Sequence, residues 1–112
     1  MKNKDNLRYV MKIMEYCDTV NELLNEYGND YSVFQSSKSF QLSTSMCIIQ
    51  IGEYVGRIDE KFRQNHDFIP WKKIRGMRDI ATHQYDKFDF KLLWYTLTVE
   101  IPELKEQLTS LL

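Results

Sequence analysis

"SFQLSTSMCIIQIGEYVGRIDEKFR", residues 39–63, is the stretch that decides the fold class. Its apolar residues recur every three or four positions, which places them on one face of a helix. That stripe consists of Phe40, Cys47, Ile51, Tyr54, Ile58 and Phe62. Three further apolar residues widen it, namely Leu42, Met46 and Ile49. The pattern predicts one long central helix, contacted by other segments on more than one side.

The residues before this segment predict two more helices. Residues 5–27 carry an apolar stripe with the same spacing, and Gly28 follows as a residue suited to ending a helix. Asp30 is placed to cap a short helix that carries Tyr31 and Phe34. We therefore expect a long helix, a turn at the glycine, and a short helix leading into the central segment.

A fourth segment follows the central one. Residues 64–69 are expected to form a loop, and Pro70 suits the first turn of a helix over residues 70–83. Gly76 lies inside this helix, where a glycine costs about 1 kcal/mol relative to alanine. A glycine there also lets another backbone or a ligand approach closely.

The last segment covers residues 90–112, with Asp89 as its expected cap. Pro102 has no N–H to donate to the carbonyl of Thr98, so we expect a kink or a short break around residues 98–101.

The composition agrees with this helical pattern. At 112 residues the chain is expected to be one domain, residues 1–112, and 43% hydrophobic content is enough to fill a core. Four glycines and two prolines are too few for a sheet with many tight turns. The sequence therefore predicts an all-α fold, an antiparallel bundle of four to five helices.

A net charge of −1 gives no general attraction for nucleic acid, so any RNA binding must rest on a local patch. One such patch is "WKKIRGMR", residues 71–78, which contains four cations and no acid. Its candidate RNA-binding residues are Trp71, Lys72, Lys73 and Arg75. The alternative interpretation is a solvated helix face with the tryptophan docked in the core.

Other motifs exclude several classes of protein. Cys17 and Cys47 lie on apolar helix faces without metal-ligand spacing, which favours buried free thiols over a disulfide. No zinc-ligand set, phosphate-binding loop or nucleophile elbow occurs, so we expect no cofactor and no metal. The chain has neither a secretory leader nor a run of ~18 apolar residues. We expect a soluble, cytoplasmic protein without membrane contact.

The stretch "RDIATHQY", residues 78–85, carries the candidate chemistry. On a straight helix Arg78 and His83 point about 140° apart, whereas Asp79 lies one turn before His83. Two arrangements would bring the arginine and the histidine to one phosphate. Either the helix ends near Thr82, so that the imidazole turns back, or a second copy of the chain supplies the missing group across a two-fold axis.

Arginine and histidine together suit RNA cleavage without a metal. The imidazole of His83 can deprotonate a ribose 2′-OH or protonate the leaving 5′-oxygen, and the guanidinium of Arg78 can stabilise the phosphate charge. Asp79 can hold the imidazole tautomer. The alternatives are a helix-end histidine with no chemical role and, for Tyr85, an ordinary loop aromatic. His66, in a polar loop, is expected to be exposed and unused.

These residues resemble the HepT-like branch of the HEPN superfamily. The resemblance rests on "PWKKIRGMRDIATHQYDKFD" (residues 70–89), which contains an R-x4-H-x-Y motif, and on "LLWYTLTVEIPELKEQL" (residues 92–108) after it. "IIQIGEYVGRI" (residues 48–58) is similar to the central helix of that family. The likeness covers most of the chain.

The resemblance implies an all-helical homodimer with the motif residues gathered at the dimer cleft. Many members are metal-independent ribonucleases that act as toxins of a type VII-like toxin–antitoxin pair. By this likeness Arg78 and His83 are catalytic, and Asp79, where the family often has asparagine, is a supporting residue. The partner would be a minimal nucleotidyltransferase antitoxin, which neutralises the toxin by transferring AMP to Tyr85.

Two other functions stay open at this point. The chain could be a non-catalytic subunit of the nucleotidyltransferase that binds nucleotide or the partner through Arg78 and His83. It could also be a plain helical interaction module.

Overall fold

The computed structural model describes residues 2–82 and 89–112, which form helices and no strand within these ranges. The prediction of an all-α fold is therefore confirmed. The elements are α1 (Lys2–Glu26), α2 (Tyr31–Ser36), α3 (Lys38–Arg57), α4 (Glu60–Asn65), α5 (Trp71–Thr82), α6 (Phe90–Tyr95), the π-helical turn η2 (Thr96–Glu100) and α7 (Ile101–Thr109).

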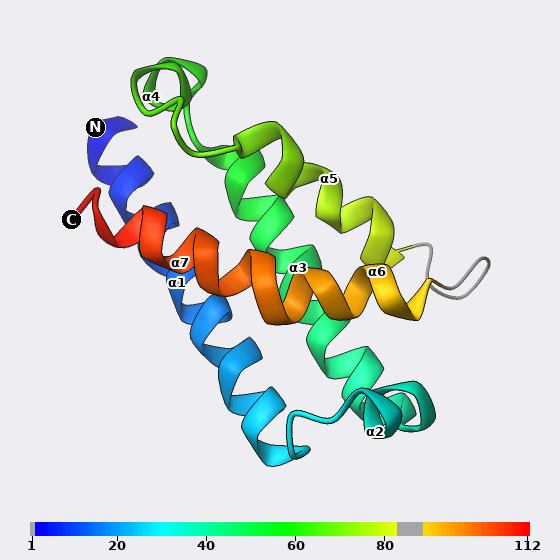
Figure 1. The fold of residues 1–112 in the computed structure, drawn as a ribbon. Helices are drawn as coiled ribbons and strands as arrows, with labels where there is room; N and C mark the ends of the chain where they lie inside the picture. Colours follow the sequence, from blue (N-terminus) through cyan, green and yellow to red (C-terminus); the bar gives the residue numbers. More distant parts are fainter. Residues whose placement is uncertain (1, 83–88) are drawn as a thin grey trace.

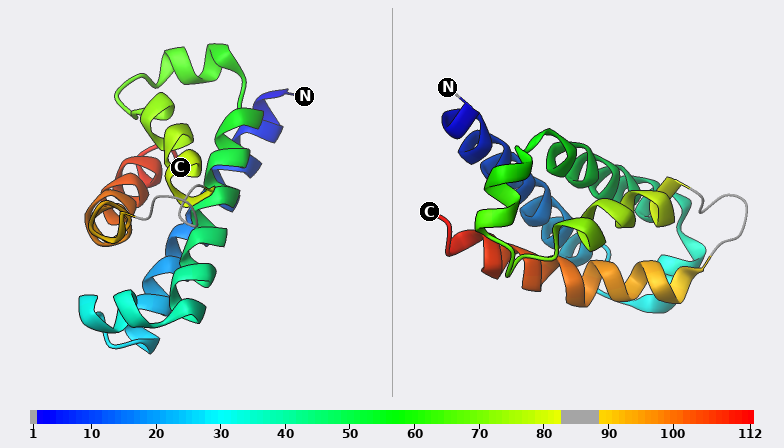
Figure 2. Two further views of the ribbon diagram at one scale, coloured as in Figure 1. Left: turned by 90° about the vertical axis from the view of Figure 1, so that its right-hand side faces the viewer. Right: turned by 90° about the horizontal axis from the view of Figure 1, so that it is seen from above.

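Helix α3 is the centre of the arrangement, as its sequence predicts. It packs most extensively against α1 on one side and α5 on the other. Helices α1 and α3 run in opposite directions, and α5 runs back along α3 (Figure 1). The elements α6, η2 and α7 form one rod that crosses the α1–α3 pair, with the two chain ends at the same end of the molecule (Figure 2).

The core is apolar, and an aromatic cluster closes the end of it near α2. The Phe34 ring of α2 lies 5.1 Å from the Phe40 ring of α3 and 5.2 Å from the Trp94 ring of α6, centroid to centroid. Tyr27, just after α1, stacks on Phe40 at 4.3 Å. The short helix α2 thus joins α3 to α6, because its phenylalanine is fully buried between rings of both.

Both polar caps and the stop signal lie where the sequence predicts them. Gly28 has a φ of +83°, a conformation that favours glycine and ends the helix. The Asp30 side chain accepts a hydrogen bond from the Ser32 N–H at 2.8 Å, and Asp89 accepts one from the Leu92 N–H at 2.9 Å. These carboxylates satisfy N–H groups that have no partner within the helix.

The long helix predicted over residues 39–63 is wrong in one respect, because it breaks after Arg57. Ile58 and Asp59 are extended, and α4 begins at Glu60. The buried Asn6 side chain of α1 accepts a hydrogen bond from the Asp59 N–H at 3.0 Å. That contact uses the Asp59 N–H, a donor that a continuous helix would bond to one of its own carbonyls. The loop expected over residues 64–69 begins only after α4 ends at Asn65.

The burial predicted for the apolar stripes is confirmed for the residues at the centre of each stripe and is wrong for some residues at its edge. On α1, Val10, Ile13, Cys17, Val20 and Leu24 are buried, whereas Leu7 is 41% exposed. On α3, Leu42 and Met46 do not widen the buried stripe. They are 41% and 55% exposed, because neither α1 nor α5 covers that face.

The predicted disturbance near Pro102 is confirmed as the π-helical turn. The Ile101 N–H bonds to the Thr96 carbonyl five residues back, which widens the turn just before the proline. A single turn of this type is an ordinary way to accommodate a missing helical hydrogen bond.

Cys17 and Cys47 are buried free thiols, as the sequence predicts. Burial raises the pKa of Cys17 to about 12 and that of Cys47 to about 11, because the core disfavours the thiolate. Neither thiol is therefore a reactive group at neutral pH. Within the described ranges, no helix is long and apolar enough to cross a membrane.

Helices α3 and α5 approach each other closely at Gly52. A Cβ added to Gly52 would lie 2.8 Å from the Arg78 Cβ, closer than real contacts allow. The close approach predicted at Gly76 does not occur within the described chain, since nothing lies within 4 Å of a Cβ there. Gly52, and not Gly76, sets the spacing of the two helices.

These two glycines give a matched test. We expect Gly52→Ala to lower the free energy of unfolding by about 1–2 kcal/mol, because α5 must move away from α3 and this outweighs the gain in helix propensity. Gly76→Ala should raise the free energy of unfolding by about 0.5–1 kcal/mol. Urea denaturation followed by circular dichroism measures both. Equal effects of the two substitutions would show that the α3–α5 approach is not constrained at Gly52.

Candidate functional site

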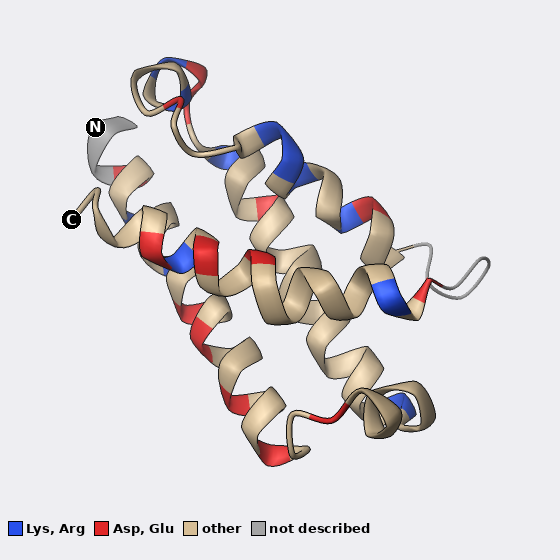
Figure 3. Cartoon of the chain, viewed as in Figure 1, with Lys and Arg blue, Asp and Glu red and all other residues tan. Residues whose placement is uncertain are grey.

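Helix α5 divides into an apolar face and a cationic one. Trp71, Ile74, Met77 and Ala81 are buried at spacings of three and four. The remaining face carries the cations and gives α5 the main concentration of positive charge seen in Figure 3, where α1 is mostly acidic. Its cations are Lys72, Lys73, Arg75 and Arg78. Burial of one face therefore orders the cations along the other.

Arg78 lies on the surface where α5 meets α3. Its Nε donates to the Glu53 Oε1 at 2.9 Å, and both side chains are about half exposed, at 47% and 41%. A solvated ion pair of this kind contributes little stability. Its effect is positional, because the carboxylate holds the guanidinium over the seam between the two helices.

Arg75 lies one turn before Arg78 and covers the second glycine of α3. Three atoms of its guanidinium lie 3.1–3.4 Å from the position that a Cβ of Gly56 would take. The sequence analysis missed Gly52, Glu53 and Gly56 as parts of this surface. The G-x3-G spacing of Gly52 and Gly56 is the signal that could have found them.

Lys73 is engaged in a contact within the chain. Its Nζ lies 2.6 Å from the Glu100 Oε2, and the Thr96 hydroxyl donates to the other oxygen of that carboxylate at 2.9 Å. The hydrogen bond to Glu100 raises the pKa of Lys73. This contact ties α5 to the π-helical turn, and sequence reasoning did not identify Glu100.

Trp71 is docked in the core, as the alternative interpretation held. Its side chain is only 7% exposed, and its indole N–H donates to the carbonyls of His66 at 3.0 Å and Arg63 at 3.2 Å. Little ring area is left for stacking on a base. His66 is not the exposed residue that was expected, since it is half-buried with its ring 4.6 Å from that of Phe62.

Two members of the predicted site, His83 and Tyr85, lie outside the described residues. Asp79 is exposed on α5 and has no hydrogen-bond or ion-pair partner in the described part of the chain. Helix α5 is described as far as Thr82, whose hydroxyl donates to the Arg78 carbonyl at 2.7 Å. The convergence of Arg78 and His83 on one phosphate therefore stays a prediction. The structure gives the position and the contacts of Arg78.

Partly exposed apolar residues of α3 lie on the same helix face as Glu53, the partner of Arg78. Leu42, Met46 and Ile49 fall within about 40° of Glu53 around the helix axis. We call these four residues the α3 stripe. Leu42 and Met46 stay 41% and 55% exposed, although the Gln50 amide lies 3.9 Å from the Met46 sulfur, and such exposure is unusual for large apolar residues that lie next to each other on one helix face.

Metal ligands are not gathered at this surface. Among the residues that the structure describes, no group of three or more His, Cys, Asp and Glu side chains could hold a metal ion. The chemistry available on the described surface is that of guanidinium, ammonium and carboxylate groups.

Comparison with known proteins shows the family to which this chain belongs. The family described as "Ribonuclease HepT-like" matches residues 8–111. A protein of Methanocaldococcus jannaschii named "Putative RNase MJ1216" is 32% identical over 113 residues, which cover 100% of this chain and 91% of the relative. "Probable ribonuclease HepT" of Thermococcus cleftensis is 32% identical over 92 residues, covering 80% and 84% of the two chains.

A bacterial relative shows the same degree of similarity. "Putative RNase TTE0752" of Caldanaerobacter subterraneus subsp. tengcongensis is 31% identical over 104 residues, which cover 93% of this chain and 91% of the relative. No solved structure matches the chain. Because the family match spans nearly the whole sequence, this chain belongs to the HepT-like ribonuclease family, and its relatives support ribonuclease activity.

Proposed function

We propose that this chain is a metal-independent endoribonuclease and the toxin of a toxin–antitoxin pair. The observation that carries the proposal is Arg78, which Glu53 holds in an exposed position at the α3–α5 seam. Its guanidinium suits phosphate oxygens, and a histidine follows five residues later in a chain of the HepT-like family.

The reaction needs one attacking oxygen, one leaving oxygen and a proton path. The ribose 2′-oxygen attacks the adjacent phosphorus as its proton is removed, and the bond to the 5′-oxygen breaks as that oxygen receives a proton. The imidazole of His83 serves one of these two transfers, and Arg78 stabilises the charge on the other phosphate oxygens. The products are a 2′,3′-cyclic phosphate end and a 5′-hydroxyl end.

The active form proposed here is a two-fold homodimer. The exposed apolar residues of the α3 stripe support it, because a second copy laid over Leu42 and Met46 would bury them. The same contact would bring two Arg78 side chains towards one axis, since the stripe continues into Glu53, the partner of Arg78. RNA would approach from the cationic face of α5, where Lys72 and Arg75 have no ion-pair partner in the described chain.

Regulation would act on Tyr85. Transfer of AMP to this hydroxyl by a minimal nucleotidyltransferase would add a negative phosphate and a bulky base seven residues from Arg78. The adduct would then compete with RNA by charge and by volume.

Cleavage without metal is the first prediction. In EDTA, the wild-type protein should cut single-stranded RNA and leave cyclic phosphate ends, because no step uses a metal. Arg78→Ala and His83→Ala should each lower the rate by ~10²–10⁴-fold, the usual contribution of such groups. Gel analysis of end-labelled RNA measures the rate.

The two variants also serve as the control for contamination. Equal decay of the RNA with all three proteins would assign the activity to a contaminant and overturn the proposal. RNA that is bound and left intact by pure wild-type protein would favour the non-catalytic binding subunit.

Dimer formation is the second prediction. Met46→Glu puts a charge into the proposed interface, so its mass in analytical ultracentrifugation should shift from dimer to monomer. Met11→Glu is the matched control, because Met11 is a methionine of nearly equal exposure, 57% against 55%, on α1. A wild-type monomer, or dissociation by Met11→Glu alone, would exclude the α3 stripe as the interface.

Modification of Tyr85 is the third prediction. After co-expression with a minimal nucleotidyltransferase, intact-mass spectrometry should show one added AMP on the wild-type chain and none on Tyr85→Phe. The modified protein should no longer cleave RNA. An unchanged wild-type mass would remove the antitoxin part of the proposal and leave the nuclease part to its own test.

A further inference from the structure

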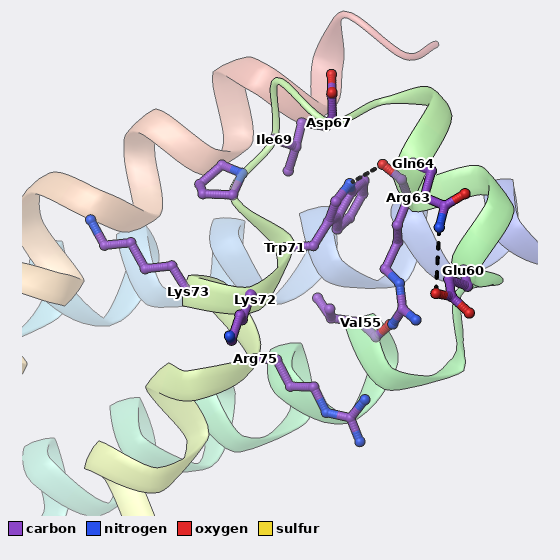
Figure 4. A pocket seen from close by; sticks show the side chains of 11 residues that line it. Val55, Glu60, Arg63, Gln64, Asp67, Ile69, Trp71, Lys72, Lys73 and Arg75 are labelled. Carbon is purple, nitrogen blue, oxygen red and sulfur yellow. Dashed lines mark hydrogen bonds between the residues drawn. The ribbon is translucent and has the colours of Figure 1, made fainter.

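An open cavity lies beside the proposed cleavage site, where α3, α4 and the start of α5 meet (Figure 4). Its volume is about 850 Å³, enough for a nucleotide or a larger ligand. The lining residues are Val55, Glu60, Arg63, Gln64, Asp67, Ile69, Pro70, Trp71, Lys72, Lys73 and Arg75. The break of the predicted long helix at residues 58–59 creates this cavity, because it lets α4 turn away from the α3 axis.

One part of the cavity is an apolar wall. Val55, Ile69 and Trp71 are each at least nine-tenths buried, and Pro70 lies beside them in the lining. The two hydrogen bonds of the Trp71 indole N–H fix this wall in position. Because so little of these three side chains is exposed, the exposed ring of Pro70 is the apolar surface that this part of the cavity offers to a flat group such as a nucleic-acid base.

The other part of the cavity is a pair of arginines. Arg63 of α4 donates from Nη1 to the Val55 carbonyl at 3.3 Å, and the Arg75 guanidinium of α5 lies against Gly56, the next residue. Both groups thus lie at the C-terminal end of α3, whose free carbonyls attract cations. In Figure 4 the two guanidinium groups lie on the same side of Trp71.

No acid of the lining forms an ion pair with either arginine. The Glu60 carboxylate accepts a hydrogen bond from the Gln64 amide at 3.4 Å, and Asp67 points away from the arginines in Figure 4. Neither Arg63 nor Arg75 forms an ion pair with any acid in the described chain. Two uncompensated guanidinium groups next to an apolar wall match a phosphate joined to a base.

We propose that this cavity binds one nucleotide of single-stranded RNA next to the cleaved linkage. Its phosphate would lie on Arg63 and Arg75, and its base against the exposed ring of Pro70. The inference rests on the proposed nuclease function, in which Arg78 holds the phosphate that is cleaved. Arg75 lies three residues before Arg78 on α5, a rise of about 4.5 Å along the helix. Consecutive phosphates would then meet consecutive arginines along the α3–α5 seam.

Single-stranded RNA is the class that this geometry selects. In a duplex the bases are paired and stacked, and none is available to enter a side cavity. The wall offers packing with few polar groups, so it would accept different bases with little sequence preference.

The test measures binding apart from cleavage. A fluorescent six-nucleotide RNA with 2′-O-methyl groups cannot be cut, so its anisotropy reports binding alone. We expect Arg63→Gln and Arg75→Gln each to weaken binding about tenfold and to reduce the slope of log affinity against log salt, by about 0.7 when both are replaced, the value for one phosphate contact on a single strand. Lys38→Gln removes one charge at the far end of α3 and should change neither quantity.

Length and charge supply two further readouts. A dinucleotide fills only the cleavage site, so the Arg63 variant should bind it as the wild type does. Arg63→Lys keeps the charge and should restore most of the salt slope, which separates a phosphate contact from a folding defect. With cleavable RNA, the KM of Arg63→Gln should rise while kcat stays unchanged.

The outcomes separate this inference from the nuclease proposal. Normal cleavage with an unchanged salt slope in both glutamine variants would overturn the nucleotide site alone. Wild-type protein that binds the hexamer through Arg63 and Arg75 and fails to cut RNA would overturn the nuclease and support the site. The absence of any RNA binding by the wild type would overturn both.

Discussion

The close contact between α3 and α5 at Gly52 is the constraint on which the surface of this molecule depends. Without a side chain at Gly52, the Cβ of Arg78 lies directly against α3. Any larger residue would push α5 outward and separate Arg78 from Glu53. The same contact places the Arg75 guanidinium on Gly56, so one helix spacing positions both arginines. The packing of the core and the arrangement of the site are therefore set together.

The partners of the α5 cations divide them by role. Lys73 is bonded to Glu100 in the π-helical turn, so it fixes α5 to the C-terminal rod. Arg78 is held by Glu53 and stays half exposed, where an anion can replace solvent around it. Lys72 and Arg75 have no acidic partner in the described chain. A protein with a net charge of −1 thus keeps a local positive surface, because its acids lie mainly elsewhere, on α1 above all.

The differences between expectation and structure have one kind of cause. The pattern of residues 39–63 predicts one helix, and both Ile58 and Phe62 still pack on the core. The break arises because Asn6, 53 residues away, bonds to Asp59. Similarly, the sequence pattern did not show that the close helix contact is at Gly52 and not at Gly76. Periodicity reports which face is apolar, and it does not report which neighbour reaches that face.

The sequence by itself determined most of the helices, their polar caps, the burial of both cysteines and the resemblance to the family, because these follow from local spacing or from motifs within short stretches. It also indicated the arginine and histidine of the candidate site by their types and order. Only the tertiary structure decided that Glu53 holds Arg78, that Trp71 is part of the core, and that Arg63 joins Arg75 at one cavity. Each of these depends on side chains from separate elements meeting in space. The spacing of residues along the sequence does not give the distance between such side chains in the folded chain.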